Sequence, residues 1–288
     1  MKRLIVTGDD FGLALPVNEA IEEAHRRGIL TTASLMVGAG ATSEAVERAQ
    51  RLPSLKVGLH LVLVKGRPVL PHQAIPDLVD KQGELSSHLV RAGINFFFRP
   101  GIRQQLEREV HAQFEAFQKT GLSLDHVNCH SHMQLHPTLF GIILKVGREY
   151  GMRAMRLPYE PLVPSWLASR KALSQKVATW LLLVPWIALL KSRLKHVHIV
   201  SNQFLFGMND SGRMGAELVH RILRHLPRGV TEIYFHPATH RCPEIDRTME
   251  DYHTRAELDA LTNPTIRQAL LALRVKTIAF SDLELLGN

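Results

Sequence analysis

Acidic and imidazole side chains follow three apolar runs of this sequence. LIVTG precedes Asp9 and Asp10, LDHVNC precedes His130 and His132, and EIYF precedes His236. Imidazoles and carboxylates bind borderline divalent cations such as Zn²⁺, and a histidine near its pKa can move a proton in catalysis. His130 and His132 would share one face if their strand continues through them. We therefore favour metal binding or acid–base catalysis for the histidine-rich segment HVNCHSHMQLH.

Several of these residues also have a purely structural interpretation. Asp10 could cap a following segment while Asp9 is solvated, and His236 could face solvent at the end of its strand. His60 lies inside the run LKVGLHLVLV and could be a hydrogen-bonded core histidine. The neighbouring Gly58 shares its face and would leave room for a ligand to approach. Taken one at a time, these residues leave both interpretations open.

The elements that must position these residues follow from the alternation of short apolar runs with amphipathic segments. This alternation predicts parallel strands joined by helices. We expect strands within 4–6, 31–37, 55–64, 122–128, 154–157, 198–200, 230–235 and 276–280. We expect helices within 16–27, 41–51, 102–119, 137–150 and 215–225 and between 251 and 274. Residues 65–99, rich in proline, glycine and polar residues, predict a long loop region.

The C-terminal ends of parallel strands face a single rim, so residues far apart in the sequence can meet there. A dinucleotide-binding G-x-G-x-x-G motif after the first strand and a phosphate-binding P-loop motif are both lacking. The length of 288 residues suits one α/β barrel of about 250 residues with an added segment. We therefore expect an α/β fold, a distorted or incomplete (β/α) barrel, as a single domain over residues 1–288.

Composition excludes several classes of protein. An apolar fraction of 45% excludes intrinsic disorder. Two cysteines exclude a disulfide framework, and the run before Asp9 is too short for a secretory signal, so we expect a cytoplasmic protein. The net charge of +8 admits anionic partners without selecting one, but no nucleic-acid-binding motif accompanies it. The G-x-S-x-G motif of α/β serine hydrolases is also lacking.

Residues 161–197 differ from the rest of the chain. Val177 to Leu190 is an almost wholly apolar run of fourteen residues that contains Pro185, Trp180 and Trp186, with lysine and arginine on both sides. A membrane-spanning helix needs about 20 apolar residues, so we expect this run not to cross a bilayer. We interpret the segment as a helical insertion. It is either a lid that faces an anionic membrane or lipid, or a buried helix pair.

Five short motifs in order resemble the YdjC-like carbohydrate deacetylases, which are metal-dependent enzymes that remove an acetyl group from N-acetylated sugars. The motifs are TGDDFG, VGLHLVL, HVNCHSHMQLHP, AMRLP and YFHPATH, and they extend over nearly the whole chain. The resemblance implies a TIM-barrel-like glycoside hydrolase/deacetylase fold, which agrees with the strand–helix alternation.

The resemblance also implies a role for particular residues. Asp10, His60 and His130 resemble the family's metal ligands, Asp9 its catalytic base and His236 the histidine opposite that base. The cofactor implied is one divalent ion. Imidazole ligands favour Zn²⁺, whereas an oxygen-rich coordination shell would admit Mg²⁺.

Arg156, in the AMRLP motif, is implied to bind substrate. The chain departs from the family pattern at Asn128, where many relatives have aspartate. A neutral side chain cannot supply charge, which puts into question how the metal-binding histidine is oriented.

The wording of the histidine motif, HVN-x-H…LHP, most resembles the hopanoid-biosynthesis-associated branch of the family. That resemblance implies an N-acetylglucosaminyl hopanoid as substrate. The apolar segment with basic flanks independently favours a lipid-linked sugar and peripheral contact with the inner face of the membrane. Three alternatives stay open: a deacetylase of soluble N-acetylated oligosaccharides, a different metal hydrolase that acts on a phosphoester or another amide, and a membrane-peripheral protein that binds metal or lipid without turnover.

Overall fold

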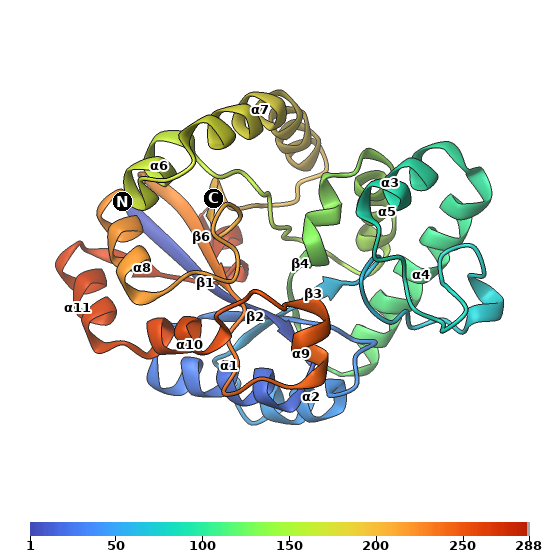
Figure 1. The fold of residues 1–288 in the computed structure, drawn as a ribbon, viewed down its shortest axis with the longest axis horizontal. Helices are drawn as coiled ribbons and strands as arrows, with labels where there is room; N and C mark the ends of the chain where they lie inside the picture. The colour runs from blue at the N-terminus through green and yellow to red at the C-terminus, as the bar shows by residue number, and fades with distance from the viewer. Residues whose placement is uncertain (287–288) are drawn as a thin grey trace.

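The computed structural model describes residues 1–286, and at its centre is one parallel sheet (Figure 1). Its strands are β1 (Lys2–Phe11), β2 (Thr32–Leu35), β3 (Lys56–Leu61), β4 (Leu124–Cys129), β5 (Phe204–Phe206), β6 (Gly229–Phe235) and β7 (Val275–Thr277). Six strands follow the order β4-β3-β2-β1-β6-β5, and β7 pairs with the first residues of β1. Because all these pairings are parallel, the strands end at a common edge, as the sequence predicts.

The sheet is curled, and isolated bridges link the regions of its two edge strands. Met155 bridges to Val127 of β4, and Ala154 bridges to Val200, which precedes β5. The result is a half-barrel with helices around it, so the expected α/β, incomplete-barrel architecture is confirmed. The strands predicted at 154–157 and 198–200 are wrong, because each segment makes only single bridges and the first runs into Pro158.

Helices surround the sheet, as Figure 1 shows. They are α1 (Leu15–Arg27), α2 (Thr42–Gln50), α3 (Leu89–Phe98), α4 (Pro100–Lys119), α5 (Pro137–Glu149), α6 (Leu162–Ser169), α7 (Leu173–His196), α8 (Ala216–Arg224), α9 (Pro243–Thr248), α10 (Thr254–Thr262) and α11 (Pro264–Ala272). Four of them, α4, α5, α9 and α11, begin at proline, whose missing N–H has no partner at a first helical position. Short 3₁₀ helices lie at His72–Ala74, His130–Leu135 and Ser281–Leu286.

Helix α3 lies inside the region that the sequence predicts as loop. Residues 89–98 are apolar around most of the helix, with Ala92 and Phe96 buried and Phe98 71% exposed. Its polar residues, Arg91 and Asn95, interrupt a run of only ten residues inside a segment rich in proline, glycine and polar residues, so the helical period is too short to stand out in the sequence. The prediction of a loop over the whole of 65–99 is therefore wrong for residues 89–98.

Helix α7 is longer than the apolar run that marks it in the sequence. It extends over 24 residues, continues through Pro185 and includes basic residues of both flanks. By length and composition it is the one helix within residues 1–286 that could cross a membrane, and only 17% of its most apolar window is buried. The expectation that the segment is too short to span a bilayer was wrong. The alternative of a buried helix pair does not describe α7 either, since Leu181 and Leu182 are 62% and 77% exposed.

Candidate metal centre

The sheet order brings Asp10, His60 and His130 together although 120 positions separate the first from the last. Asp10 lies near the end of β1, His60 in β3, and His130 directly after β4. Oδ1 of Asp10 lies 3.2 Å from Nε2 of His60 and 3.2 Å from Nδ1 of His130, and the two ring nitrogens are 3.4 Å apart. All three side chains are buried. The ligand set implied by the resemblance therefore converges on one point.

This triad fits a divalent cation. The second oxygen of Asp10, Oδ2, is buried and has no hydrogen-bond partner among residues 1–286. Burial opposes ionisation of Asp10, but the neighbouring His130 outweighs it and holds the pKa of that carboxyl well below its usual range. Burial likewise opposes charge on His60, yet the hydrogen bond to Asp10 and the charge of Asp9 raise its pKa. The electrostatics of the centre therefore favour a bound cation. Two imidazoles and one carboxylate are suitable ligands for a divalent metal ion.

Asn128 orients the ring of His60. Its side-chain nitrogen donates to Oδ1 of Asp9 (3.1 Å) and to Oγ of Ser34 (2.9 Å), so its oxygen faces His60. Nδ1 of His60 lies 2.7 Å from that oxygen and must therefore be the donor. In a neutral ring this leaves Nε2, the atom that faces Asp10 and His130, with its lone pair free. A neutral amide therefore orients the ring by hydrogen bonding, without supplying charge.

Asp9 is held by Arg156 in a bidentate ion pair. Nη1 of Arg156 donates to Oδ2 of Asp9 (2.6 Å) and Nη2 donates to Oδ1 (3.0 Å). Nε and Nη2 also donate to Oε1 of Glu232, at 2.9 and 2.6 Å. Burial disfavours the charge of Asp9, but Arg156 more than compensates and holds the pKa of the carboxyl well below its usual range. Asp9 and Asp10 are both buried, so the interpretation of this pair as a solvated turn is wrong.

Arg156 is 1% exposed, and its guanidinium also lies 4.7 Å from the centre of the Tyr234 ring. All three of its nitrogen atoms donate to Asp9 or Glu232. The contacts described are those of a residue that positions a carboxylate. Binding of substrate by Arg156 stays a prediction.

His236 lies in the same cavity as Asp9 and the triad. Its ring packs edge-on against Tyr234 and Tyr252, with ring centres 5.5 and 4.9 Å apart. Its Nδ1 is buried and lacks a partner in the described part of the chain. Burial lowers the pKa of His236, which favours the neutral ring. Its backbone N–H donates to Glu257, whose pKa is raised to about 7 by burial.

His132 does not share a face with His130. Strand β4 ends at Cys129, and Ser131 and His132 have left-handed φ values of 55° and 52°. The chain therefore turns between the two histidines, and Nε2 of His132 lies 3.0 Å from the hydroxyl of Tyr234. Burial lowers the pKa of His132 to about 3. The expectation that these two imidazoles form a pair on one strand face was wrong.

The space beside Gly58 is taken by protein. A side chain at this position would have its Cβ 2.4 Å from the ring of His126, which is fully buried and stacks on Phe280. Gly58 therefore makes room for a core histidine and not for a ligand.

Sequence reasoning missed several residues around the centre: Ser34, Glu232, Tyr234, Tyr252 and Glu257. Glu232 and Tyr234 belong to the apolar run that predicts β6, and a carboxylate inside such a run needs a buried partner. That signal could have found Glu232, whereas Tyr252 comes from the segment between α9 and α10 and carries no comparable signal.

The proteins similar to this chain include two curated relatives and one solved structure. A carbohydrate deacetylase of Brevibacillus brevis is 40% identical over 151 residues, which are 51% of this chain and 56% of that protein. The chain thus spans about half the length of this relative. A carbohydrate deacetylase of Vibrio parahaemolyticus is 25% identical over 283 residues, 98% of this chain and 96% of that protein.

The solved structure is that of a candidate cellobiose-phosphate cleavage protein from Enterococcus faecalis V583. It aligns with a TM-score of 0.74 and 23% identity over 98% of both chains, which shows a shared fold. Residues 3–272 match the family model described as YdjC-like protein, and the chain therefore belongs to the YdjC-like family.

Proposed function

We propose that this protein is a metal-dependent hydrolase that removes the acetyl group from an N-acetylated sugar. The observation that carries the proposal is the convergence of Asp10, His60 and His130, within 4.8 Å of one another, in a cavity that also contains Asp9 and His236. The carbohydrate deacetylases among the relatives support the choice of substrate class.

Hydrolysis of an acetamide needs an activated carbonyl, an activated water and a proton for the departing amine. A divalent ion held by Asp10, His60 and His130 would polarise the carbonyl and lower the pKa of water. The ion pair with Arg156 keeps Asp9 ionised and fixed, as a proton acceptor requires. The same pair makes Asp9 a weak base, so it suits only a water more acidic than bulk water.

His236 is assigned the opposite side of the reacting group. Burial keeps its ring neutral, and Nδ1 has no protein partner within the described chain. A neutral imidazole can donate its N–H to the charge that develops on the carbonyl oxygen. To protonate the departing amine, the ring must first accept the proton that the attacking water releases, because only the imidazolium can act as a general acid. Both roles need a ring in the cavity and beside the reacting atoms.

The finer substrate assignment is an N-acetylglucosaminyl lipid of the hopanoid type. Support comes from α7, which presents exposed leucines and lies between basic residues. Such a helix suits the interface of an anionic membrane. We accordingly place the protein in the cytoplasm, in peripheral contact with the inner face of the membrane, with residues 161–197 as the helical insertion that makes this contact.

The test measures acetate release from an N-acetylglucosaminyl lipid and from N,N′-diacetylchitobiose, with and without a chelator, together with the metal content of each variant. We expect chelation to abolish release and added Zn²⁺ or Mg²⁺ to restore it, which identifies the metal. Asp10→Asn and His130→Ala should lose both metal and turnover, whereas Asp9→Asn should keep metal and lose turnover.

The matched control is His111→Ala, which removes a partly exposed histidine on α4, outside the cavity. It should keep both metal and activity. Acetate release that survives chelation, or an Asp10→Asn variant with a full complement of metal, would contradict the proposed function. Equal turnover of the lipid and of the soluble disaccharide would contradict the lipid assignment alone.

A further inference from the structure

Helix α3 carries large apolar side chains on the side that faces away from the protein. It packs on α4 and α5, and Ala92 and Phe96 are buried on that inner side. Because an α-helix turns by about 100° per residue, four other residues share the opposite side. We call them the α3 face: Val90, Ile94, Phe97 and Phe98, each at least 44% exposed. The outer side of a surface helix is ordinarily polar, so the α3 face is suited to bind an apolar partner.

The surroundings of the α3 face are positively charged. Between Glu84 and Glu107 the chain has three arginines, one histidine and no carboxylate side chain. Both of these flanking acids are already paired with basic residues of other elements. Arg91 and Arg99 are exposed, and neither pairs with an acid within residues 1–286. The charge around the α3 face therefore complements an anionic surface.

Arg103 holds the aromatic end of the α3 face in place. Its Nε donates to the backbone oxygen of Phe96 (3.2 Å), and its guanidinium lies 5.9 Å from the centre of the Phe97 ring. The rings of Phe97 and Phe98 meet edge to face, with their centres 4.9 Å apart. The last turn of α3 is thus capped while its aromatic rings point outward. Aromatic residues beside basic ones are typical of helices that lie between the headgroups and the acyl chains of a membrane.

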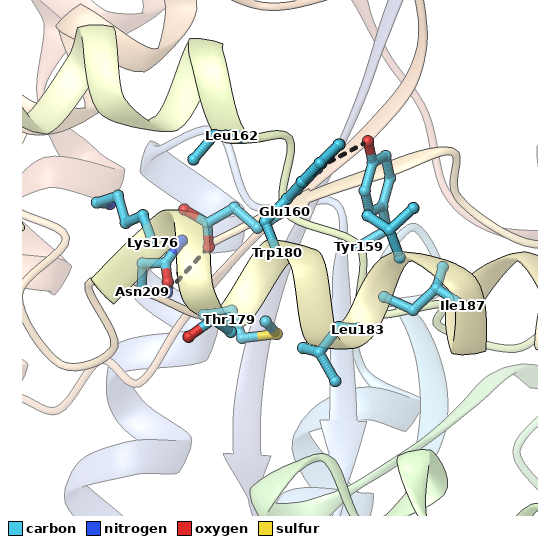
Figure 2. A pocket seen from close by; sticks show the side chains of 11 residues that line it. Tyr159, Glu160, Leu162, Lys176, Thr179, Trp180, Leu183, Ile187 and Asn209 are labelled. Atoms are coloured by element: carbon cyan, nitrogen blue, oxygen red, sulfur yellow. Dashed lines mark hydrogen bonds between the residues drawn. The ribbon is translucent and has the colours of Figure 1, made fainter. Parts of the chain in front are cut away.

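Helix α7, the other helix with an exposed apolar side, turns its tryptophans toward the protein. Nε1 of Trp180 donates to the hydroxyl of Tyr159 (3.4 Å), as Figure 2 shows. Nε1 of Trp186 donates to the backbone oxygen of Leu135 (2.8 Å). The outer side of α7 is left with leucines. The exposed aromatic rings within residues 1–286 therefore belong to the α3 face.

Both helices contact the end of the 3₁₀ helix that begins with His130. Leu135 ends this 3₁₀ helix and accepts the hydrogen bond from Trp186 of α7. In the next residue, His136, Nε2 lies 3.0 Å from the backbone oxygen of Gly93 in α3. Helices α3 and α7 thus meet two adjacent residues of one short segment. A surface bound at α3 would lie beside the segment that supplies a candidate metal ligand.

We propose that the α3 face binds an anionic phospholipid bilayer, with its four apolar side chains among the acyl chains and with Arg91 and Arg99 at the lipid phosphates. The proposal goes beyond the proposed function, because it assigns a second membrane-binding helix and depends on neither metal nor turnover. A second copy of the chain is the less suitable occupant. It would bring the arginines of two α3 faces together with no acid between them.

The test measures co-sedimentation with phosphatidylglycerol vesicles, without substrate or added metal. Val90→Gln/Ile94→Gln should weaken binding by about tenfold or more, because two apolar side chains no longer enter the bilayer. The matched control is Leu15→Gln/Leu271→Gln, which removes two exposed leucines on α1 and α11. This control should bind as the wild type does. Equal binding by the wild type, the α3 variant and the control would overturn the proposal.

The basic residues are tested by a second pair of variants. Arg91→Gln/Arg99→Gln should weaken binding by about tenfold, because each basic residue near the surface attracts anionic lipid. Arg224→Gln/Arg228→Gln makes the same change in net charge at two other exposed arginines and should weaken binding much less. Equal losses in these two variants would mean that net charge alone directs the protein to the vesicle, which contradicts a role for the α3 face.

Sedimentation velocity without vesicles tests for a second copy of the chain. A wild type that self-associates but does not bind vesicles, with Val90→Gln/Ile94→Gln monomeric, would overturn the proposal, because the α3 face would then be an interface between copies. Acetate release from N,N′-diacetylchitobiose should be the same in the wild type and in this variant, since α3 does not line the metal cavity. If the wild type releases no acetate, the proposed function fails alone, and vesicle binding that this variant loses still supports the α3 face.

Discussion

The carboxamide oxygen of Asn128 accepts a 2.7 Å hydrogen bond from Nδ1 of His60, at the point where β3 and β4 pair. The bond fixes the ring so that Nε2 faces the other two residues of the triad. Asn128 is itself fixed, because its nitrogen donates to Asp9 and Ser34. One amide thus connects the candidate base, a candidate metal ligand and the neighbouring strand β2.

Replacing this amide tests its role in metal binding. Asn128→Ala removes the acceptor for His60, so the ring loses its fixed orientation. Loss of such a supporting hydrogen bond typically weakens metal binding about 10- to 100-fold. Zn²⁺ affinity measured by competition with a chromogenic chelator should fall by that amount. Ser34→Ala, which removes contacts to the nitrogen of Asn128 and to the ring of His126 but none to the triad, should change the affinity much less. Undiminished affinity in Asn128→Ala would show that the bond does not support the site.

The buried arginine predicts a second outcome, for stability. Arg156→Met would leave Asp9 and Glu232 buried without their shared cation. Breaking a buried ion pair from one side costs about 3–5 kcal/mol of the free energy of unfolding. Urea denaturation should show this loss. The matched control is Arg255→Met, whose ion pair with Asp259 is largely exposed and should contribute little. Similar unfolding midpoints for the two variants would mean that the buried pair is not a stabilising contact.

The metal triad could be predicted because the resemblance to the YdjC-like family implies Asp10, His60 and His130 as ligands. The strand pattern agrees with that set, since each residue lies in or after an apolar run and parallel strands end at one edge of a sheet. By itself, the pattern left a structural role for His60 open. His132 shows the limit of this reasoning, because the turn after Cys129 depends on left-handed residues that no alternation pattern reveals.

The residues that hold the triad and Asp9 in place could not be predicted, and the reason is different. Arg156 meets Asp9 and Glu232 across 147 and 76 positions, and no periodicity relates their places in the sequence. Such pairings depend on which strands are neighbours and in what register, and β5 at Phe204–Phe206 was itself too short to be expected. The extent of α7 was missed because its basic ends fold as helix although they interrupt the apolar run.

Glu257 predicts a dependence of stability on pH. Burial raises its pKa to about 7 from an ordinary 4.5, against the backbone N–H groups of His236 and Met214, and the charge of Asp9 adds to the increase. The folded state therefore binds this proton more tightly than the unfolded state. The contribution to stability is complete below about pH 4.5 and is lost as the pH rises to about 7, for a total of about 3 kcal/mol.

The measurement compares the wild-type protein with Glu257→Gln in urea at several pH values from 5 to 8. Glutamine keeps one acceptor for the two N–H donors and does not titrate. The free energy of unfolding of the wild type should therefore fall relative to that of the variant between pH 5 and 7, and the difference should level off above pH 7. Parallel curves over the whole range would mean that Glu257 is already ionised at pH 5.

The outer face of α7 predicts binding to anionic membranes. Leu181 and Leu182 are exposed, the helix includes Lys191, Arg193 and Lys195, and the chain has a net charge of +8. Burying two leucines in an interface contributes enough for Leu181→Gln/Leu182→Gln to weaken binding more than about tenfold. Co-sedimentation with phosphatidylglycerol vesicles should show this loss, and salt should reduce binding of the wild type because basic residues attract the surface.

The control for that experiment is Leu271→Gln on α11, which removes a leucine that is 74% exposed and far from α7 in sequence. It should bind vesicles as the wild type does, and vesicles of phosphatidylcholine should bind all the proteins weakly. If the α7 variant and Leu271→Gln co-sediment equally, exposed leucine alone does not direct the protein to a membrane. The membrane contact would then have to come from another surface of the protein.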